Sequence, residues 1–251
     1  MPNEDLILSA RGIHKGFGAV VAADDVNIDV PRGAIYSLIG SNGAGKTTFV
    51  NMVTGYIKPD KGSILFQGRD ITREVPRTIT RMGIHRSFQI AQLCNGLSAI
   101  ENMMVAQAIN GDTAPGFFRS ANNRAAVEQA QATLERFGIA EFRDRPIAEL
   151  PGGVKKLLDI AMAIAGKTDI MLLDEPTSGV ASDEKFPIMD RVIKALTEAG
   201  VTILFVEHDM EIVNRYAHQV VAFYAGRVIA NDKPDTVLAD AEVKRYVTGG
   251  A

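Results

Sequence analysis

The segment that most constrains this chain is a glycine-rich run at residues 40–47, Gly-Ser-Asn-Gly-Ala-Gly-Lys-Thr, which fits the pattern G-x-x-x-x-G-K-[S/T]. The apolar residues 34–39 before it predict a buried strand. Residues 47–56 after it place apolar side chains along one helical stripe. The run therefore predicts a strand-to-helix turn, and its glycines allow backbone N–H groups to surround phosphate oxygens.

Lys46 lies in the first turn of the predicted helix, which is an unfavourable place for a cation. The helix dipole destabilises a positive charge there by about 0.3–1 kcal/mol, unless an anion sits between the two. A bound phosphate reverses the sign of that interaction. The alternative interpretation of this motif is a glycine-rich turn with a solvated lysine.

A second motif places two carboxylates at the end of a buried strand. Residues 170–173 are a continuous apolar run followed by Asp174, Glu175 and Pro176, and the proline cannot donate to further ladder pairing. In an extended chain the two carboxylates point to opposite faces, so separate tasks are implied. Asp174 suits a magnesium shell beside Thr47, and Glu175 suits orienting or deprotonating an attacking water in phosphoryl transfer. A solvent-facing acidic turn is the alternative.

Two further polar residues follow predicted strands. Gln89 comes after residues 83–88, and His208 comes shortly after residues 202–206. Because open α/β sheets bind ligands beyond the carboxyl ends of their strands, we expect these side chains near the phosphate loop. Taken singly, each is more often structural. No Cys/His spacing in the sequence indicates zinc. The other histidines are interpreted as structural: His14, His85 and His218.

The rhythm of the whole chain predicts an α/β protein with a mostly parallel sheet, because short apolar runs alternate with longer helical patterns. Residues 6–14, 24–30 and 34–39 follow one another as strands and predict an antiparallel element at the N-terminal side. Residues 98–166 are helical in pattern and predict an inserted helical subdomain. Further strands are expected at residues 170–173, 202–206, 219–224 and 227–231, with helices at 183–199 and 210–217.

Charge and cysteine content narrow the function classes. With 27 basic and 30 acidic residues the net charge is −3, so no basic field favours a nucleic-acid partner. Cys94 is the single cysteine, and residues 1–5 are polar rather than a secretion signal, which favours a reducing cytoplasm. The longest apolar runs fall far short of the ~20 residues that cross a bilayer, so we expect any membrane role to be peripheral.

Taken in order, these motifs resemble those of ATP-binding-cassette (ABC) transporter ATPases, and the resemblance covers nearly the whole chain. Residues 40–48 resemble the family's Walker A loop, Gln89 the Q-loop, residues 150–154 the signature, residues 170–175 Walker B, and His208 the switch histidine. The resemblance implies a P-loop NTPase fold with a mostly parallel sheet.

The resemblance also implies how the chain is divided. A single ABC ATPase domain would span residues 1–251. Residues 1–89 and 167–251 would form the RecA-like core with an antiparallel β subdomain, and residues of about 90–166 the helical signature subdomain.

Each motif residue receives a role from the same resemblance. Glu175 would be the general base, and the other catalytic residues would be His208, Gln89 and Lys46. Mg²⁺ would be held by Thr47, Gln89 and Asp174. ATP would contact an adenine-stacking aromatic, the Walker A loop and the signature glycines: Phe17, Ser41, Asn42, Gly43, Ala44, Gly45, Lys46, Thr47, Thr48, Gly152 and Gly153. A hydrophobic strand end is the alternative interpretation of Phe17.

The signature departs from the family's Ser-Gly-Gly-Gln. Pro151 replaces the serine whose hydroxyl contacts the γ-phosphate of the ATP that is bound by the opposite subunit. Val154 replaces the glutamine. Gly152 and Gly153 still open a helix and retain a backbone anion site. Ala181 stands where many relatives carry an aspartate, although LivG-type chains commonly lack it too. These departures favour an asymmetric heterodimer with a second ABC ATPase, with a homodimer as the alternative.

Finer features at residues 86–89, 206–210 and 242–249 are similar to the LivG-type subunit of branched-chain amino-acid importers. That similarity implies a peripheral ATPase on the cytoplasmic face of the inner membrane. Its partners would be two transmembrane permease subunits and, indirectly, an external solute-binding protein, with no nucleic acid. Residues 90–118 are expected to form part of the groove for the permease's coupling helix, with Phe117 and Phe118 either there or buried.

Three alternatives stay open at this point. The lipopolysaccharide-type ABC exporter ATPase uses the same chemistry with other membrane partners. Soluble ABC ATPases of DNA repair or translation carry long coiled-coil insertions or two cassettes, for which the sequence between Lys46 and Gly152 is too short. If the chain were a P-loop kinase or GTPase, the two glycines that open a helix, Gly152 and Gly153, and the strand-end His208 would have no assigned role. The transported solute is left open, with branched-chain amino acids or a related small polar solute as the first candidate.

Overall fold

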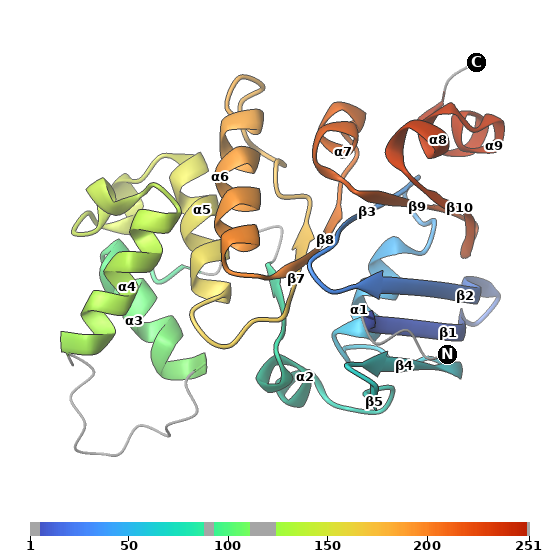
Figure 1. The fold of residues 1–251 in the computed structure, drawn as a ribbon, viewed down its shortest axis with the longest axis horizontal. Helices are drawn as coiled ribbons and strands as arrows, with labels where there is room; N and C mark the ends of the chain where they lie inside the picture. The colour runs from blue at the N-terminus through green and yellow to red at the C-terminus, as the bar shows by residue number, and fades with distance from the viewer. Residues whose placement is uncertain (1–5, 88–92, 111–123, 250–251) are drawn as a thin grey trace.

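The computed structural model describes residues 6–87, 93–110 and 124–249. Its strands form a six-stranded sheet in the order β10-β9-β3-β8-β7-β6 and a four-stranded sheet in the order β2-β1-β4-β5. Figure 1 shows the smaller sheet on one side of the larger one and the helices α3, α4 and α5 on the other side. The described part of the chain is thus an α/β fold, as the sequence predicted.

The six-stranded sheet is parallel except at one edge. β9, β3, β8, β7 and β6 run parallel to their neighbours, and β10 pairs antiparallel with β9. β3 and β8 are buried at every residue, as expected for central strands covered on both faces. The strands are β3 (Ile35–Gly40), β6 (Ile84–Ser87), β7 (Ile170–Asp174), β8 (Thr202–Val206), β9 (Gln219–Tyr224) and β10 (Arg227–Asp232).

The four-stranded sheet is antiparallel and corrects one prediction. Residues 34–39 were expected in the antiparallel element, but β3 lies in the parallel sheet because both of its faces are buried. The third antiparallel strand is instead β4, which pairs with β1. The strands of this sheet are β1 (Leu6–Phe17), β2 (Val20–Pro31), β4 (Lys61–Phe66) and β5 (Arg69–Asp70).

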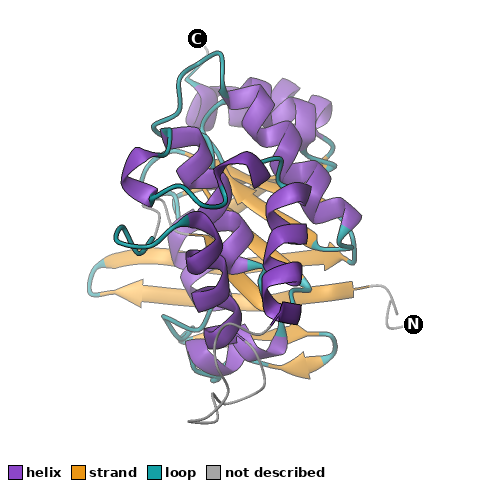
Figure 2. Cartoon of the chain, turned by 90° about the vertical axis from the view of Figure 1, so that its left-hand side faces the viewer, coloured by secondary structure: helices purple, strands orange, loops and turns teal. Residues whose placement is uncertain are grey.

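Figure 2 shows helices packed in front of the strands, and the buried apolar residues form two cores, one on each face of the parallel sheet. On β3, Ile35 and Ile39 belong to the core beneath the larger set of helices. Tyr36 and Leu38 face the second core, shared with α1 and the antiparallel sheet. The helices are α1 (Lys46–Val53), α2 (Pro76–Met82), α3 (Ala99–Asn110), α4 (Arg124–Arg136), α5 (Gly152–Ala163), α6 (Lys185–Glu198), α7 (Met210–Tyr216), α8 (Pro234–Ala239) and α9 (Ala241–Val243).

The end of α1 differs from the predicted stripe over residues 47–56. The helix ends at Val53, and Gly55 has a left-handed φ of 76° that turns the chain away. Tyr56 is consequently 58% exposed rather than packed beneath the helix. Within the ranges that the structure describes, no helix is both long and apolar enough to cross a membrane.

Candidate functional site

The glycine-rich loop connects β3 to α1 and leaves no room for larger residues at two positions. A Cβ atom on Gly40 would lie 2.5 Å from the Phe223 carbonyl oxygen, and one on Gly45 would lie 2.5 Å from the Ala22 carbonyl oxygen. Both glycines also have positive φ, at 153° and 113°. The loop therefore packs directly against the backbones of β9 and β2, and only glycine fits at these two positions.

Lys46 is buried at the start of α1, with 5% of the residue exposed. Its Nζ donates to the Gly40 carbonyl oxygen at 2.6 Å and to the Ser41 carbonyl oxygen at 3.1 Å. Burial lowers the pKa of this ammonium, and the nearby Glu175 and Asp174 carboxylates partly oppose that effect. An anion bound in the loop would stabilise the charge that burial destabilises.

The carboxyl ends of β3, β8, β7 and β6 meet at one edge of the sheet, because these strands are neighbours and parallel. A cavity of about 120 Å³ opens there. It brings together most of the predicted catalytic and phosphate-binding residues, and it is lined by Asn42, Gly43, Ala44, Gly45, Lys46, Thr47, Thr48, Asp174, Glu175, Val206 and His208.

The acidic pair does not keep the extended conformation considered from the sequence. β7 ends at Asp174, and Glu175 takes a left-handed φ of 47° while its N–H donates to the Val206 carbonyl oxygen at 3.0 Å. Both carboxylates consequently line the same cavity instead of pointing to opposite faces. A left-handed non-glycine residue costs of order 1–3 kcal/mol and is concentrated at functional sites. His208 lies beside Glu175, with its Nε2 3.3 Å from Oε1.

Of the predicted site residues that the structure describes, Phe17, Ser41 and the two signature glycines do not line this cavity. Phe17, at the end of β1, is 49% exposed, and the Lys15 ammonium sits 5.4 Å from the centre of its ring. Gly152 and Gly153 open α5 after Pro151 and do not line the cavity. Gln89 lies outside the described residues, just beyond the end of β6.

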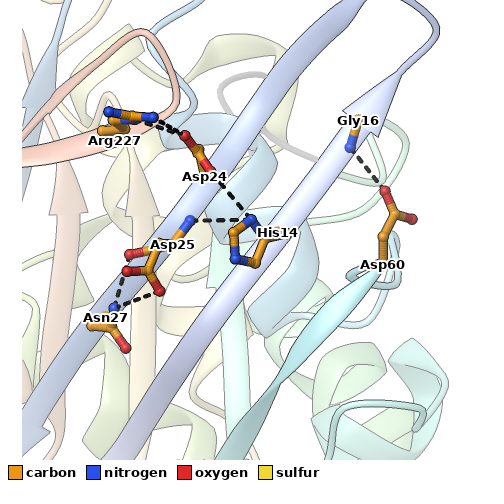
Figure 3. A network of polar contacts seen from close by, with 7 residues as sticks. All are labelled: His14, Gly16, Asp24, Asp25, Asn27, Asp60 and Arg227. Atoms are coloured by element: carbon orange, nitrogen blue, oxygen red, sulfur yellow. Dashed lines mark hydrogen bonds and ion pairs between the residues drawn. The ribbon is translucent and has the colours of Figure 1, made fainter.

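The β1–β2 hairpin that carries Phe17 is fastened to the glycine-rich loop by the β9–β10 turn. The Gly226 N–H donates to the Ala44 carbonyl oxygen at 3.0 Å, and its carbonyl accepts from the Asp24 N–H at 2.9 Å. Figure 3 shows the Asp24 carboxylate between Arg227 and His14, 2.7 Å from the arginine Nε. The hydrogen bond from Arg227 holds the pKa of Asp24 below its usual range.

Comparison with known proteins gives the family. Residues 23–178 match the family described as ABC transporter, which is more than half of the chain. The chain belongs to the ABC transporter family. As an ATP-binding cassette of this family, it is an ATPase. As a P-loop ATPase of this family, it carries the glycine-rich loop between β3 and α1.

Curated relatives of this cassette match along nearly their whole length. A probable branched-chain amino acid transport ATP-binding protein, LivG, from Archaeoglobus fulgidus is 34% identical over 97% of this chain and 95% of its own length. The high-affinity branched-chain amino acid transport ATP-binding protein LivG of Escherichia coli K12 is 32% identical, covering 98% of each.

The solved structures include an ATP-binding cassette of an ABC transporter in its ADP conformation. It has 31% sequence identity and a TM-score of 0.86, and the match covers 96% of this chain and 97% of the other. The comparison agrees with the P-loop ABC fold that the resemblance implied.

Two charged residues of the cassette were not singled out from the sequence. Glu207, between β8 and His208, is 4% exposed, and its Oε1 accepts from the Thr177 N–H at 3.0 Å and the Thr177 hydroxyl at 2.6 Å. Its Oε2 accepts from the His208 N–H at 3.1 Å. Arg86 on β6 contacts Asp174 and Asn51. Glu207 thus connects the segment after β7 to the backbone of His208.

We predict that Glu207→Gln lowers the free energy of unfolding by about 1–3 kcal/mol, because an amide N–H₂ then faces a backbone donor and a buried bond is lost. Urea unfolding measures the change as a shift of the midpoint. Glu198→Gln, on the exposed face of α6, is the matched control and should leave the midpoint in place. An unchanged midpoint for Glu207→Gln would show that this network does not support the site.

Proposed function

We propose that this chain is the ATP-hydrolysing subunit of an ABC importer for branched-chain amino acids or a related small polar solute. The observation that carries the proposal is one cavity lined by Lys46, Asp174, Glu175 and His208 in a cassette whose curated relatives are importer ATP-binding proteins. The relatives match over nearly the full length of both chains, so the whole chain, and not one part of it, is similar to an importer ATP-binding subunit.

The cavity residues divide the chemistry of ATP hydrolysis between them. Lys46, once it bonds to a phosphate oxygen, stabilises negative charge that develops in the transition state. Glu175 accepts a proton from the attacking water, and His208 lies close enough to orient that carboxylate. Phe17 supports the adenine ring, and the Walker A loop from Ser41 to Thr48 surrounds the phosphates.

The donor set of the cavity also fits magnesium. The Thr47 hydroxyl and the Asp174 carboxylate line the same space, and hydroxyl and carboxylate oxygens are the ligands that Mg²⁺ takes beside phosphates. Gln89 would complete the shell. When bound, the ion neutralises charge on the β- and γ-phosphates. Thr47 and Asp174 would hold the ion, and the glycine-rich loop would align the phosphates with Glu175.

The proposed assembly contains two permease subunits, a second ABC ATPase and, indirectly, an external solute-binding protein, at the cytoplasmic face of the inner membrane. Within one cassette domain, residues 1–89 and 167–251 form the core and about 90–166 the helical signature subdomain. The proposed coupling groove over residues 90–118 lies partly outside the described residues, and so do Phe117 and Phe118. In the closed dimer, Gly152 and Gly153 would face the nucleotide bound by the second cassette.

An uptake experiment tests the importer assignment. The gene is removed from its native host, and uptake of labelled leucine, isoleucine and valine is measured. Wild-type chain and the exposed control Glu198→Gln should restore uptake, and Glu175→Gln should not. Uptake that is unchanged by the removal, together with a loss of lipopolysaccharide export, would replace the importer by an exporter.

The unusual signature leads to a separate prediction for the assembled transporter. The double change Pro151→Ser and Ala181→Asp should raise its ATPase rate about 10–100-fold, since one hydroxyl bond to the charged γ-phosphate is worth about 1.5–3 kcal/mol. Pro151 has φ −57° and ψ 152°, a conformation that serine adopts without strain. An unaltered rate in the complete complex would argue that these departures are neutral and that an asymmetric heterodimer is not required.

A further inference from the structure

Arg86 is a largely buried cation that connects three elements around the cavity. It lies on β6, and its side chain is 11% exposed. Its Nη1 donates to the Asn51 Oδ1 on α1 at 2.6 Å, and its Nη2 donates to the Asp174 Oδ2 at the end of β7 at 2.5 Å. One guanidinium group therefore fixes the Walker B aspartate relative to the helix that follows the Walker A loop.

Asn51, the partner of Arg86 on α1, lies on the same face of the helix as Thr47, a proposed magnesium ligand. Asn51 follows Thr47 by four residues on this helix, so the two side chains lie on the same face, one turn apart. The Asp174 carboxylate uses Oδ2 for Arg86 and also lines the cavity with Thr47. A carboxylate has about four acceptor positions, so this pairing leaves capacity for a metal ion.

Arginine suits this connection better than lysine does. Its planar fork presents donors in fixed directions, whereas a lysine ammonium is a single point on a flexible stem. Partners that hydrogen-bond to a metal-ligating carboxylate fix its orientation, and their loss typically costs about 10–100-fold in metal affinity or activity.

We propose that Arg86 is a positioning residue for the magnesium site: anchored by Asn51, it holds Asp174 in the orientation that binds the ion beside Thr47. The inference rests on the magnesium role proposed above for Asp174 and Thr47. The proposed role of Arg86 is exerted through its contact with Asp174. Its loss consequently lowers the affinity of the site for magnesium, so that more Mg²⁺ is needed to tighten nucleotide binding, and leaves magnesium-free nucleotide binding in place.

A binding titration with the full-length chain tests this role. Binding of a fluorescent ATP analogue is measured against Mg²⁺ concentration and separately in EDTA, in a Glu175→Gln background that prevents turnover. Arg86→Lys should raise the Mg²⁺ concentration for half-maximal tightening by about 10–100-fold. Asn51→Ala should shift it in the same direction by less, because the contact between Arg86 and Asp174 persists. Affinity in EDTA should stay unchanged in both variants, and Arg81→Lys, an exposed change on α2, is the matched control.

The outcomes separate the inference from the proposal beneath it. An unshifted Mg²⁺ requirement in Arg86→Lys overturns the positioning role, and so does an equal loss of affinity in EDTA, which would indicate a general structural role. If Arg86→Lys does not fold, Asn51→Ala decides, because an unshifted requirement there also overturns the role. If the background protein binds the analogue equally with and without Mg²⁺, the magnesium site itself is wrong.

Discussion

Replacing Glu175 by glutamine reduces ATP hydrolysis by about 10²–10⁴-fold, the usual contribution of a positioned general base, while ATP binding persists. The amide has nearly the shape of the carboxylate and keeps the place beside His208, but it accepts no proton from water. Glu175 lines the cavity with Lys46 and Asp174. Because a carboxylate repels phosphate oxygens, we expect ATP binding to persist without its charge. Phosphate release at saturating ATP and equilibrium binding of ATP give the two measurements.

The matched control for that change is Glu211→Gln on α7, which is an exposed carboxylate outside the Walker motifs. It should hydrolyse ATP at the wild-type rate. Normal turnover by the Glu175→Gln protein would remove Glu175 as the general base and direct attention to the other groups at the same edge of the sheet.

Replacing Lys46 by alanine weakens ATP binding by about 10–100-fold, the equivalent of one hydrogen bond to a charged group, and abolishes hydrolysis with it. The ammonium is buried and held at the loop by the Gly40 and Ser41 carbonyls. Among the described residues that line the cavity, no other lysine or arginine is present to replace it. Binding of inorganic tripolyphosphate should fall by a similar factor, because Lys46 acts on the phosphates rather than the base.

Lys194→Ala provides the control, since this lysine is exposed on α6 with 74% of its side chain accessible. Its ATP affinity should equal that of the wild type. A Lys46→Ala protein with wild-type affinity for both ATP and tripolyphosphate would contradict a phosphate-binding role for the loop.

The parts of the site carried by local pattern were predictable from the sequence. Apolar runs followed by polar residues predict β3, β7 and β8. Parallel pairing then places the carboxyl ends of these strands at one edge of the six-stranded sheet. Lys46, Asp174 and His208 line one cavity because each follows the carboxyl end of a parallel strand, and the sequence pattern alone predicts this.

The parts that depend on distant pairing were not predictable. Arg86 and Asp174 are 88 residues apart in sequence, and Thr177 and Glu207 are 30 apart. Charged residues are normally exposed, so nothing in the local pattern marks Arg86 or Glu207 as buried. The left-handed backbone of Glu175 is likewise set by its bond to β8 and not by its neighbours in sequence.

The local sequence also could not predict which of the two sheets contains β3. Its sequence is that of a strand in either arrangement, and only burial on both faces distinguishes a central parallel strand from an antiparallel one. β4, which takes the expected third place beside β1, has exposed residues at its start and a weaker apolar pattern.

The most direct test of the account is to identify what the cassette binds when it is trapped with ATP. A tagged Glu175→Gln chain is expressed in its native host, Mg-ATP is added, membranes are extracted gently, and co-purifying proteins are identified by mass spectrometry. We predict two permease chains and a second, different ABC ATPase, with the accompanying solute-binding protein indicating the solute. Recovery with exporter subunits, ribosomes or DNA would leave the ATP site intact and contradict the importer.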